Sequence, residues 1–297
     1  MIKQLPKVIV ILGPTASGKT ALSIKLAKRF KGEIVSADSR QIYKYLDIGT
    51  GKVTKKEMQG INHHMLDVTL PKKKYSVGQY QKTAYKAINN ILKNGNQPFL
   101  VGGSAFYLYS VADGWELPKT KTDWALRKKL EKKTPQELLA ILNGLDKRRA
   151  QNIEQQNPRR LIRAIEIATQ LGGVPERQNN PKYACLFLGI KKNDEELKNL
   201  IKKRLLKRLK SGMLSEVKNL LKKKILTDKR AKELGLEYKW LTMHLLGEIS
   251  YEQMVERLAT DIWRFSKHQM NWFGKDKRIH WVASQEEAQR LVKTFLK

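Results

Sequence analysis

The sequence contains one cysteine, no long hydrophobic run and few acidic residues for its length of 297 residues. The single cysteine, Cys185, excludes a disulfide framework within the chain and a cysteine-rich zinc site. Because it lies inside the apolar stretch 183–190, we expect it to be a buried strand residue. The apolar run Val8–Leu12 is far shorter than the ~20 residues that a membrane-spanning helix needs. We therefore expect a soluble, cytoplasmic protein without a membrane partner.

Acidic residues are scarce relative to basic ones. The chain has 59 Lys and Arg against 28 Asp and Glu, a formal net charge of +31. An AT-rich coding bias would also raise the lysine content, but a charge this large favours a polyanionic partner such as nucleic acid. The excess is densest over residues 191–232, which hold 16 basic and 5 acidic residues. We refer to this segment as the basic stripe.

Near the N-terminus an apolar run breaks into the pattern G-x-x-x-x-G-K-T. Such a loop joins a strand to a helix, and its backbone N–H groups, here from about Ala16 to Thr20, point at phosphate oxygens. Lys19 would add a positive charge, and the Thr20 hydroxyl would ligate a Mg²⁺ shared with the phosphates. The loop is of the nucleotide- and ATP-binding type but does not itself identify the phosphate compound. The predicted phosphate-binding residues are Gly13, Pro14, Thr15, Ala16, Ser17, Gly18, Lys19 and Thr20.

A carboxylate follows the next predicted strand. Residues 33–37 form a β-type run that ends at Asp38. Because working groups in open α/β sheets lie at the carboxyl ends of strands, Asp38 should face the same crevice as the phosphate loop. It could serve as a general base or as a metal ligand, and the alternative is a structural helix N-cap.

Two further predicted strands have polar residues near their ends. Residues 97–101 run into Gly102-Gly103-Ser104, where an ATPase usually has an aspartate, and this favours a ligand that approaches the backbone closely. Residues 62–68 resemble another strand, in which His63 and His64 are more typical of structure than of a metal site. Asp67 keeps open the alternative of a nucleotidase with a second metal-binding aspartate.

From Trp115 the pattern becomes helical without intervening strands. We predict short charged helices over 123–133, 135–142 and 146–155 and a well-capped helix over 157–171. This pattern indicates a helical insertion. In the last of these helices Arg159 and Arg163 share one face, where they could contact a ligand or pair with Glu166.

The C-terminal part returns to one strand and then continues as helices. The strand is predicted over 183–190 and the helices over 194–210, 213–224, 229–245 and 250–273. The last helix carries four aromatic residues whose spacing is more typical of a core than of a base-stacking surface. These residues are Trp263, Phe265, Trp272 and Phe273.

Together these motifs resemble those of the tRNA dimethylallyltransferases over nearly the whole chain. The motifs that carry the resemblance are Gly13-Pro-Thr-Ala-Ser-Gly-Lys-Thr20, Asp38-Ser-Arg-Gln-Ile-Tyr43, Asp47-Ile-Gly-Thr50 with Lys52, His63-His-Met-Leu-Asp-Val68, Val101-Gly-Gly-Ser-Ala-Phe-Tyr107, Asn157-Pro-Arg-Arg-Leu-Ile-Arg-Ala164 and Gln269 with Trp272-Phe273. The resemblance implies transfer of a dimethylallyl group from dimethylallyl diphosphate to N6 of the adenosine at position 37 of tRNA, with Mg²⁺.

The same resemblance implies a fold and a domain organisation. The expected fold is α/β, with a P-loop parallel-sheet core and a helical C-terminal region formed by residues 1–114 and 180–297. An all-helical insertion over 115–179 would grip the tRNA anticodon stem-loop. The protein is expected to act as a monomer.

The resemblance also implies roles for individual residues. Asp38 is similar to the general base, and Ser104 stands where relatives usually have threonine. Lys19 and Arg204 resemble residues that stabilise the departing diphosphate. The residues that resemble tRNA contacts are Asp38, Ser39, Arg40, Gln41, Ser104, Arg127, Arg159, Arg160 and Arg163. This chain departs from the family pattern at Leu200, where relatives often have arginine, and at Ile262-Trp263, which replaces a common Thr-Arg pair.

The chemistry of the residues fits this activity independently. An exocyclic adenine amine is a poor nucleophile, so a base such as Asp38 must take its proton as it attacks. An adenine stacked in a loop must also be flipped out to be reached. The alternatives are a P-loop kinase or NTPase, a prenyltransferase for free adenine nucleotides, and a basic RNA-binding protein without catalysis. The strand that ends in glycines argues against the kinase or NTPase. The helical insertion and the basic stripe argue against a small nucleotide substrate, and the complete phosphate loop argues against a protein without catalysis.

Overall fold

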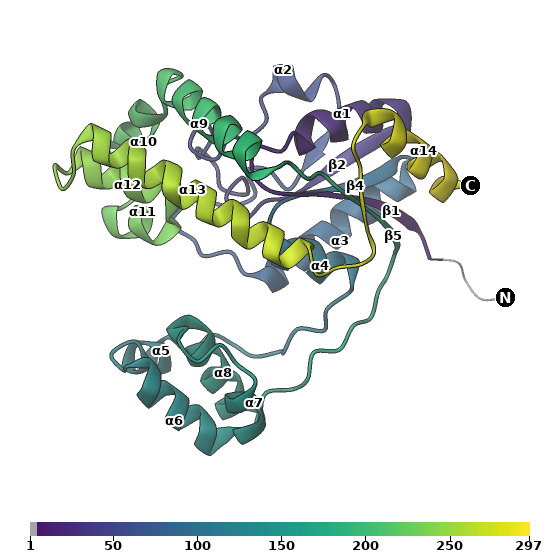
Figure 1. Ribbon diagram of the computed structural model, residues 1–297. Coiled ribbons are helices and arrows are strands. Elements are labelled where there is room, and N and C mark those ends of the chain that lie inside the picture. The colour runs from purple at the N-terminus through teal and green to yellow at the C-terminus, as the bar shows by residue number, and fades with distance from the viewer. Residues whose placement is uncertain (1–4) are drawn as a thin grey trace. The chain divides into compact units, whose positions relative to one another are not determined.

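The computed structural model describes residues 5–297 and forms two compact units. The first, which we call the core unit, contains the chain up to Gly114 and again from Pro181 to Lys297. The second, the helical unit, contains Trp115–Asn180. Figure 1 shows the elements of each unit. None of the helices in the described part of the chain is long and apolar enough to cross a membrane.

Within residues 5–297, the core unit is built on one six-stranded sheet in which every pair of neighbours is parallel. In sheet order the strands are β3 (His63–His64), β2 (Gly32–Ala37), β4 (Gln97–Gly102), β1 (Lys7–Leu12), β5 (Ala184–Gly189) and β6 (Ile279–Trp281). The register places Leu12, Ala37 and Gly102 side by side at the carboxyl ends of the three central strands. This arrangement confirms the predicted α/β fold class with a parallel sheet.

Helices cover both faces of the sheet (Figure 1). On one face lie α1 (Lys19–Arg29) and α14 (Gln285–Leu296), whose apolar side chains share a buried cluster with the strands. On the other face lie α3 (Val77–Lys93) and α4 (Ala105–Ala112). Because both faces are buried, the central strands are apolar nearly throughout and do not alternate with polar residues.

Apart from the short helix α2 (Lys55–Met58), the remaining helices of the core unit follow β5. They are α9 (Asp194–Lys210), α10 (Met213–Lys222), α11 (Asp228–Leu234), α12 (Leu236–Leu245) and α13 (Tyr251–Phe273). The prediction of one helix over 229–245 is wrong. Gly235 adopts φ 73° and ψ −171°, a conformation that a helix cannot continue, and it divides this segment into α11 and α12.

The helical unit has its own buried core. Its helices are α5 (Trp124–Leu130), α6 (Pro135–Leu145), α7 (Lys147–Gln151) and α8 (Pro158–Leu171). Leu138, Leu142 and Leu161 are completely buried between them. The two ends of the unit pair with each other, because Trp115 forms an antiparallel bridge with Asn179 and the Glu116 N–H donates to the Gln178 carbonyl at 3.0 Å.

Other parts of the fold differ from the sequence-based expectation. The strand predicted over 62–68 is wrong beyond His64, because Met65 and Asp67 have φ angles of 66° and 56° that end the extended chain. The short helix α2 (Lys55–Met58) and the C-terminal elements β6 and α14 were not predicted. Cys185 lies in β5 as expected but is only half-buried, and this burial raises the pKa of its thiol to about 12.

Candidate active site

The carboxyl ends of β1, β2 and β4 border a cavity of about 100 Å³ in the core unit. Lys19 and Thr20 reach it from the phosphate loop, Asp38 and Gln41 from the segment after β2, and Arg204 from α9. The fold thus brings together residues from three separate parts of the sequence. This is the place where open α/β sheets present their working groups.

The phosphate loop has backbone angles that suit its glycines. Gly13 has φ 147°, and a Cβ there would lie 2.6 Å from the Ile190 carbonyl oxygen. Ala16 and Gly18 have φ values of 62° and 95°, which curl the chain ahead of α1. Since α1 begins at Lys19, the positive end of the helix dipole also lies at the cavity.

Lys19 is held inside the curl of this loop. Its Nζ donates to the Pro14 carbonyl at 2.5 Å. Burial and the nearby Arg204 guanidinium lower the pKa of Lys19 to about 7, against the opposing effect of Asp38. An anionic ligand in the cavity would favour the charged form of this amine.

Two side chains from the C-terminal helices hold the phosphate loop. Arg204 donates to the Thr15 hydroxyl at 3.3 Å and to the Gly51 carbonyl at 3.3 Å. Gln269, which is buried, accepts from the Thr15 N–H at 2.8 Å and donates to the Gly103 carbonyl at 2.9 Å. The sequence motif contained Gln269, but its part in joining the loop to the end of β4 was not foreseen.

Asp38 uses one carboxylate oxygen to shape the backbone. Its Oδ1 accepts from the N–H groups of Arg40 at 2.8 Å and of Gln41 at 3.3 Å. No helix begins here, so this is a turn and not the helix N-cap considered as an alternative. Within residues 5–297 no hydrogen bond occupies Oδ2, and Asp38 lines the cavity.

Ser104 fixes the segment that carries Asp38. Its hydroxyl oxygen accepts from the Ser39 N–H at 3.0 Å, across the gap between the ends of β2 and β4. Gly102 is required beside it, because a Cβ on Gly102 would overlap the Ala37 backbone. Ser104 therefore contacts the neighbour of Asp38, while the carboxylate itself is held by its own turn.

Arg40 and Gln41 complete this segment. Gln41 accepts from the Ser36 hydroxyl at 3.4 Å and donates from Nε2 to the Gly51 carbonyl at 3.2 Å. Burial lowers the pKa of the Arg40 guanidinium, against the opposing effects of Tyr43 and Asp38. Both residues are partly buried, and Gln41 lines the first cavity whereas Arg40 lines neither cavity.

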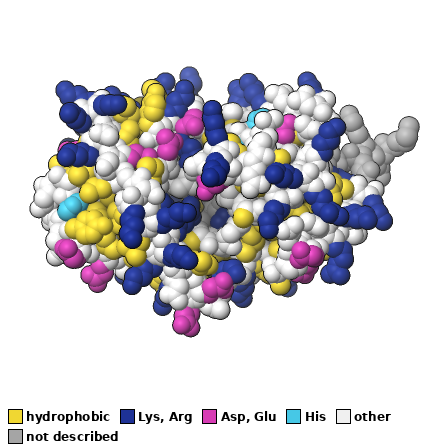
Figure 2. Space-filling view, turned by 90° about the horizontal axis from the view of Figure 1, so that it is seen from above, with side chains coloured by type: hydrophobic (Ala, Val, Ile, Leu, Met, Phe, Trp, Pro, Cys, Tyr) yellow, Lys and Arg dark blue, Asp and Glu magenta, His cyan; other side chains and the backbone are white. Residues whose placement is uncertain are grey.

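A second and larger cavity, of about 570 Å³, adjoins the outer side of the phosphate loop. Lys25, Lys203 and Lys207 line it together with Arg204, and so does Leu200. Lys19 and Glu57 line it as well, and because the basic side chains outnumber the single carboxylate, the lining is positive even though Leu200 is apolar. Figure 2 shows Lys and Arg side chains standing over much of the molecular face seen from above.

A magnesium ion fits the chemistry of the Thr20 side of the first cavity. No hydrogen bond among the described residues uses the Thr20 hydroxyl, and Asp38 lines the same cavity. Residues 5–297 contain no group of three His, Cys, Asp or Glu side chains that could hold a metal. His63 and His64 instead contact the Ile61 carbonyl and Glu33. Mg²⁺ commonly takes its ligands from water and substrate phosphates, so Thr20 could suffice on the protein side.

The arginines of the helical unit are mostly paired. Glu166 is completely buried and accepts from Arg127 at 2.6 and 2.9 Å and from Arg163. Burial acts to raise the pKa of Glu166, but the hydrogen bonds from these arginines hold it below its usual range. Arg160 pairs with Glu154 at 2.9 Å. Arg159 is exposed and makes no ion pair with the rest of the described chain.

The aromatic residues of α13 are not a single core cluster, so the expectation of core packing is wrong for most of them. Only Phe273 is completely buried. The Trp263 ring centroid lies 4.9 Å from the Lys198 ammonium and 5.3 Å from the Lys267 ammonium, and Trp272 packs edge-on against Phe106. Phe265 lines the first cavity and is 38% exposed, which makes it available to a ligand.

Comparison with known proteins gives consistent matches over this architecture. A family model described as IPP transferase matches residues 41–276. A tRNA dimethylallyltransferase of Acetivibrio thermocellus is 38% identical over 95% of this chain and 93% of its own length. The enzyme of the same name from Carboxydothermus hydrogenoformans is 37% identical over the same shares.

Solved structures agree with the sequence matches. The full-length tRNA isopentenylpyrophosphate transferase of Bacillus halodurans superimposes with a TM-score of 0.74 at 31% identity, covering 98% of this chain and 96% of that one. A eukaryotic dimethylallyltransferase acting on tRNA gives a TM-score of 0.76 at 26% identity, covering 90% of this chain and 70% of that one. With the phosphate loop and Asp38 on one cavity and these matches over nearly its full length, the chain belongs to the IPP transferase family.

Proposed function

We propose that this protein transfers the dimethylallyl group of dimethylallyl diphosphate to N6 of the adenosine at position 37 of tRNA. The observation that carries the proposal is that a phosphate loop and the Asp38 carboxylate, whose Oδ2 has no hydrogen-bond partner among residues 5–297, line one cavity in a member of the IPP transferase family. The relatives' names, which specify tRNA and a dimethylallyl group, support the choice of both substrates.

Asp38 is the general base in this proposal. The N6 amine attacks C1 of the dimethylallyl group, the C1–O bond breaks, and its electron pair leaves with the diphosphate. The proton of the amine passes to Oδ2 of Asp38, because Oδ1 is already engaged by the Arg40 and Gln41 N–H groups. The turn that holds Oδ1 therefore also fixes the orientation of Oδ2.

The diphosphate is bound by the phosphate loop. Backbone N–H groups, the N-terminus of α1 and the side chains of Lys19 and Arg204 supply positive potential where the leaving group gains charge. Thr20 would hold a Mg²⁺ ion, which would neutralise part of this charge. Lys25, Lys203 and Lys207 in the adjoining cavity can attract the anion as it enters and as it leaves.

The rest of the first cavity suits the organic parts of the substrates. Ile34, Val53 and Leu66 give it an apolar side that can accommodate the five-carbon chain. Phe265, from α13, can stack on a flipped adenine, and Gln41 can hydrogen-bond it. Ser39 and Arg40 lie on the same segment and are proposed to contact the nucleotide.

The tRNA is proposed to bind through its anticodon stem-loop. The net charge of +31 and the basic stripe suit a phosphate backbone. In the helical unit, Arg159 is free to meet a phosphate, whereas Arg127 and Arg163 would act mainly by shaping the unit through Glu166. Because all the side chains assigned to the reaction belong to a single chain, we propose a monomer, and we propose that it acts in the cytoplasm, where tRNA is found.

The test is incubation of the pure protein with unmodified tRNA, Mg²⁺ and either labelled dimethylallyl diphosphate or labelled ATP. Label should enter tRNA only from dimethylallyl diphosphate, and enzymatic digestion of the tRNA should place it on the adenosine at position 37. Incorporation from ATP, or robust ATP hydrolysis stimulated by tRNA, would refute the proposal in favour of a P-loop kinase or NTPase.

A further inference from the structure

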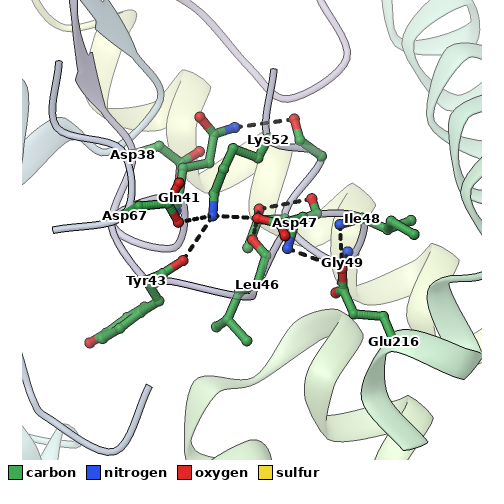
Figure 3. A network of polar contacts seen from close by, with 12 residues as sticks. Asp38, Gln41, Tyr43, Leu46, Asp47, Ile48, Gly49, Lys52, Asp67 and Glu216 are labelled. Atoms are coloured by element: carbon green, nitrogen blue, oxygen red, sulfur yellow. Dashed lines mark hydrogen bonds and ion pairs between the residues drawn. The ribbon is translucent and has the colours of Figure 1, made fainter. Parts of the chain in front are cut away.

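The loop between Leu46 and Lys52 is held by a carboxylate from the C-terminal helices. Both oxygens of Glu216, on α10, accept hydrogen bonds from three consecutive backbone N–H groups. The donors are those of Asp47 at 3.1 Å, Ile48 at 2.6 Å and Gly49 at 2.9 Å. Figure 3 shows Glu216 pointing at this turn of the chain. A carboxylate seated on successive N–H groups makes charge-assisted bonds, which are stronger than neutral ones.

Neighbouring side chains complete the attachment. The Tyr238 hydroxyl, on α12, donates to Glu216 at 2.9 Å, so the carboxylate has four donors. Arg208 of α9 donates to the carbonyls of Ile48 and Gly49. Gly49 must lack a side chain, because a Cβ there would overlap the Tyr238 hydroxyl. The C-terminal helices thus provide a negative partner for the loop's donors and a positive partner for its acceptors.

The same loop continues into the candidate active site. Two residues after Gly49, the Gly51 carbonyl accepts from both Gln41 at 3.2 Å and Arg204 at 3.3 Å. Thr50 lines the first cavity, and Gly51 lines the second. A Cβ on Gly51 would overlap the Arg204 guanidinium, so the backbone and the arginine are in close contact.

Lys52 holds the other end of the loop. Its Nζ donates to the Tyr43 carbonyl at 2.9 Å and to the carboxylates of Asp47 at 2.6 Å and Asp67 at 2.7 Å (Figure 3). The side chain of Lys52 is buried, with 6% of its surface exposed. Glu216 thus fixes the beginning of the loop and Lys52 fixes its end. The Gly51 carbonyl lies between these two points of attachment.

We propose that Glu216 is a positioning residue for the transfer reaction, which sets the place of Arg204 and Gln41 through the 47–51 backbone. This inference rests on the proposed function. Glu216 itself lines neither cavity, and it acts on the reaction only through the loop. In its absence the loop's three N–H groups lose their common partner, and Gly51 can move away from the two side chains that it holds.

The test compares Glu216→Gln with Glu233→Gln, a matched change of a half-buried carboxylate that pairs with Arg230 on α11 and does not touch the loop. Single-turnover transfer is measured at saturating tRNA and dimethylallyl diphosphate, together with the Kd for tRNA. An amide oxygen can replace only one of the two carboxylate oxygens, so Glu216→Gln should slow transfer by about 10- to 100-fold, as misplacement of reacting groups does. The Kd for tRNA and the rate of Glu233→Gln should stay near wild type.

Hydrogen exchange separates positioning from general destabilisation. In Glu216→Gln the amides of 47–52 should exchange faster while the sheet amides remain as in wild type. Transfer within twofold of wild type, equal losses in both variants, or faster exchange throughout the chain would each overturn the proposal. If Glu216→Gln does not fold, Tyr238→Phe is used instead. This variant removes one of the four donors and should slow transfer by a smaller factor. An unchanged transfer rate in Tyr238→Phe would then refute the proposal. The exchange measurement needs no turnover, and wild-type transfer is measured alongside, so failure of the proposed function is seen separately.

Discussion

At the residue scale, the two oxygens of Asp38 have different partners, and this makes the general-base assignment testable. In Asp38→Asn the amide oxygen can still accept from the Arg40 and Gln41 N–H groups, so the turn should persist. The amide cannot take a proton, so single-turnover transfer should fall by about 10²- to 10⁴-fold. tRNA affinity, measured by filter binding, should change little. Transfer near the wild-type rate would show that the carboxylate has only the structural role.

Ser104 is a second test in the same crevice, with a variant that should be tolerated. Ser104→Thr keeps the hydroxyl that accepts from the Ser39 N–H and should transfer at nearly the wild-type rate. Ser104→Ala leaves that N–H unpaired at a cost of ~1 kcal/mol and frees the segment that carries Asp38. Slower transfer with unchanged tRNA affinity is expected for the alanine variant alone. Equal rates for the two variants would contradict a role for the hydroxyl.

The lowered pKa of Lys19 predicts how binding of the diphosphate depends on pH. Because its pKa in the free protein is lowered to about 7, the amine is mostly neutral at pH 8, and an anion must recharge it on binding. Binding therefore takes up a proton, and affinity for dimethylallyl diphosphate should fall as pH rises above 7, by up to about tenfold per unit. Calorimetry in two buffers of different ionisation enthalpy between pH 7 and 9 measures that uptake. In Lys19→Arg, which stays charged, the pH dependence should disappear.

At the element scale, the basic stripe separates into residues with different tasks. Arg204 and Arg208 of α9 point at the site and its loop, whereas Lys222 and Lys223 at the end of α10 are exposed. If the end of α10 lies on the tRNA path, Lys222→Ala with Lys223→Ala should reduce the slope of log affinity against log salt by roughly 0.7 to 0.9 per lost contact. Arg290→Ala with Lys293→Ala on α14 is the matched control. If the two double variants have the same slope of log affinity against log salt, Lys222 and Lys223 do not contact tRNA and serve only solubility.

The elements that the sequence predicted well are those with strong local signals. α8 begins at the Asn157 cap and ends before Gly172 with φ 74°, as the pattern of cap, proline and glycine indicated. The division at Gly235 and the short β3 depend on single backbone angles that periodicity does not report. β6 has only three residues, and it exists because β5 offers it an edge.

The candidate site shows the same limit. Motifs identified the phosphate loop and Asp38 because their chemistry is local in sequence. The parts played by Gln269 and Glu216 could not be predicted, since each depends on a contact with a residue more than 160 positions away. The pairing of Arg163 with Glu166 was one of two alternatives, and only the fold, which adds Arg127, distinguishes them.

At the scale of the whole molecule, the division into two units predicts separable functions. Every residue that lines either cavity belongs to the core unit. A variant in which residues 116–178 are replaced by a short Gly-Ser linker should therefore bind dimethylallyl diphosphate as the full chain does and lose affinity for tRNA. Calorimetry with the diphosphate and filter binding with tRNA measure the two. Loss of diphosphate binding in a variant whose thermal melting remains cooperative would contradict the separation.

The paired ends of the helical unit have a consequence for how the protein can evolve. Because Trp115 pairs with Asn179, the chain enters and leaves the helical unit at neighbouring residues. A segment joined in this way can be gained, lost or exchanged in one genetic event without rethreading the sheet. Selection could then redirect the same prenyl transfer to a different nucleic acid by replacing the helical unit while the residues that line the cavity stay unchanged.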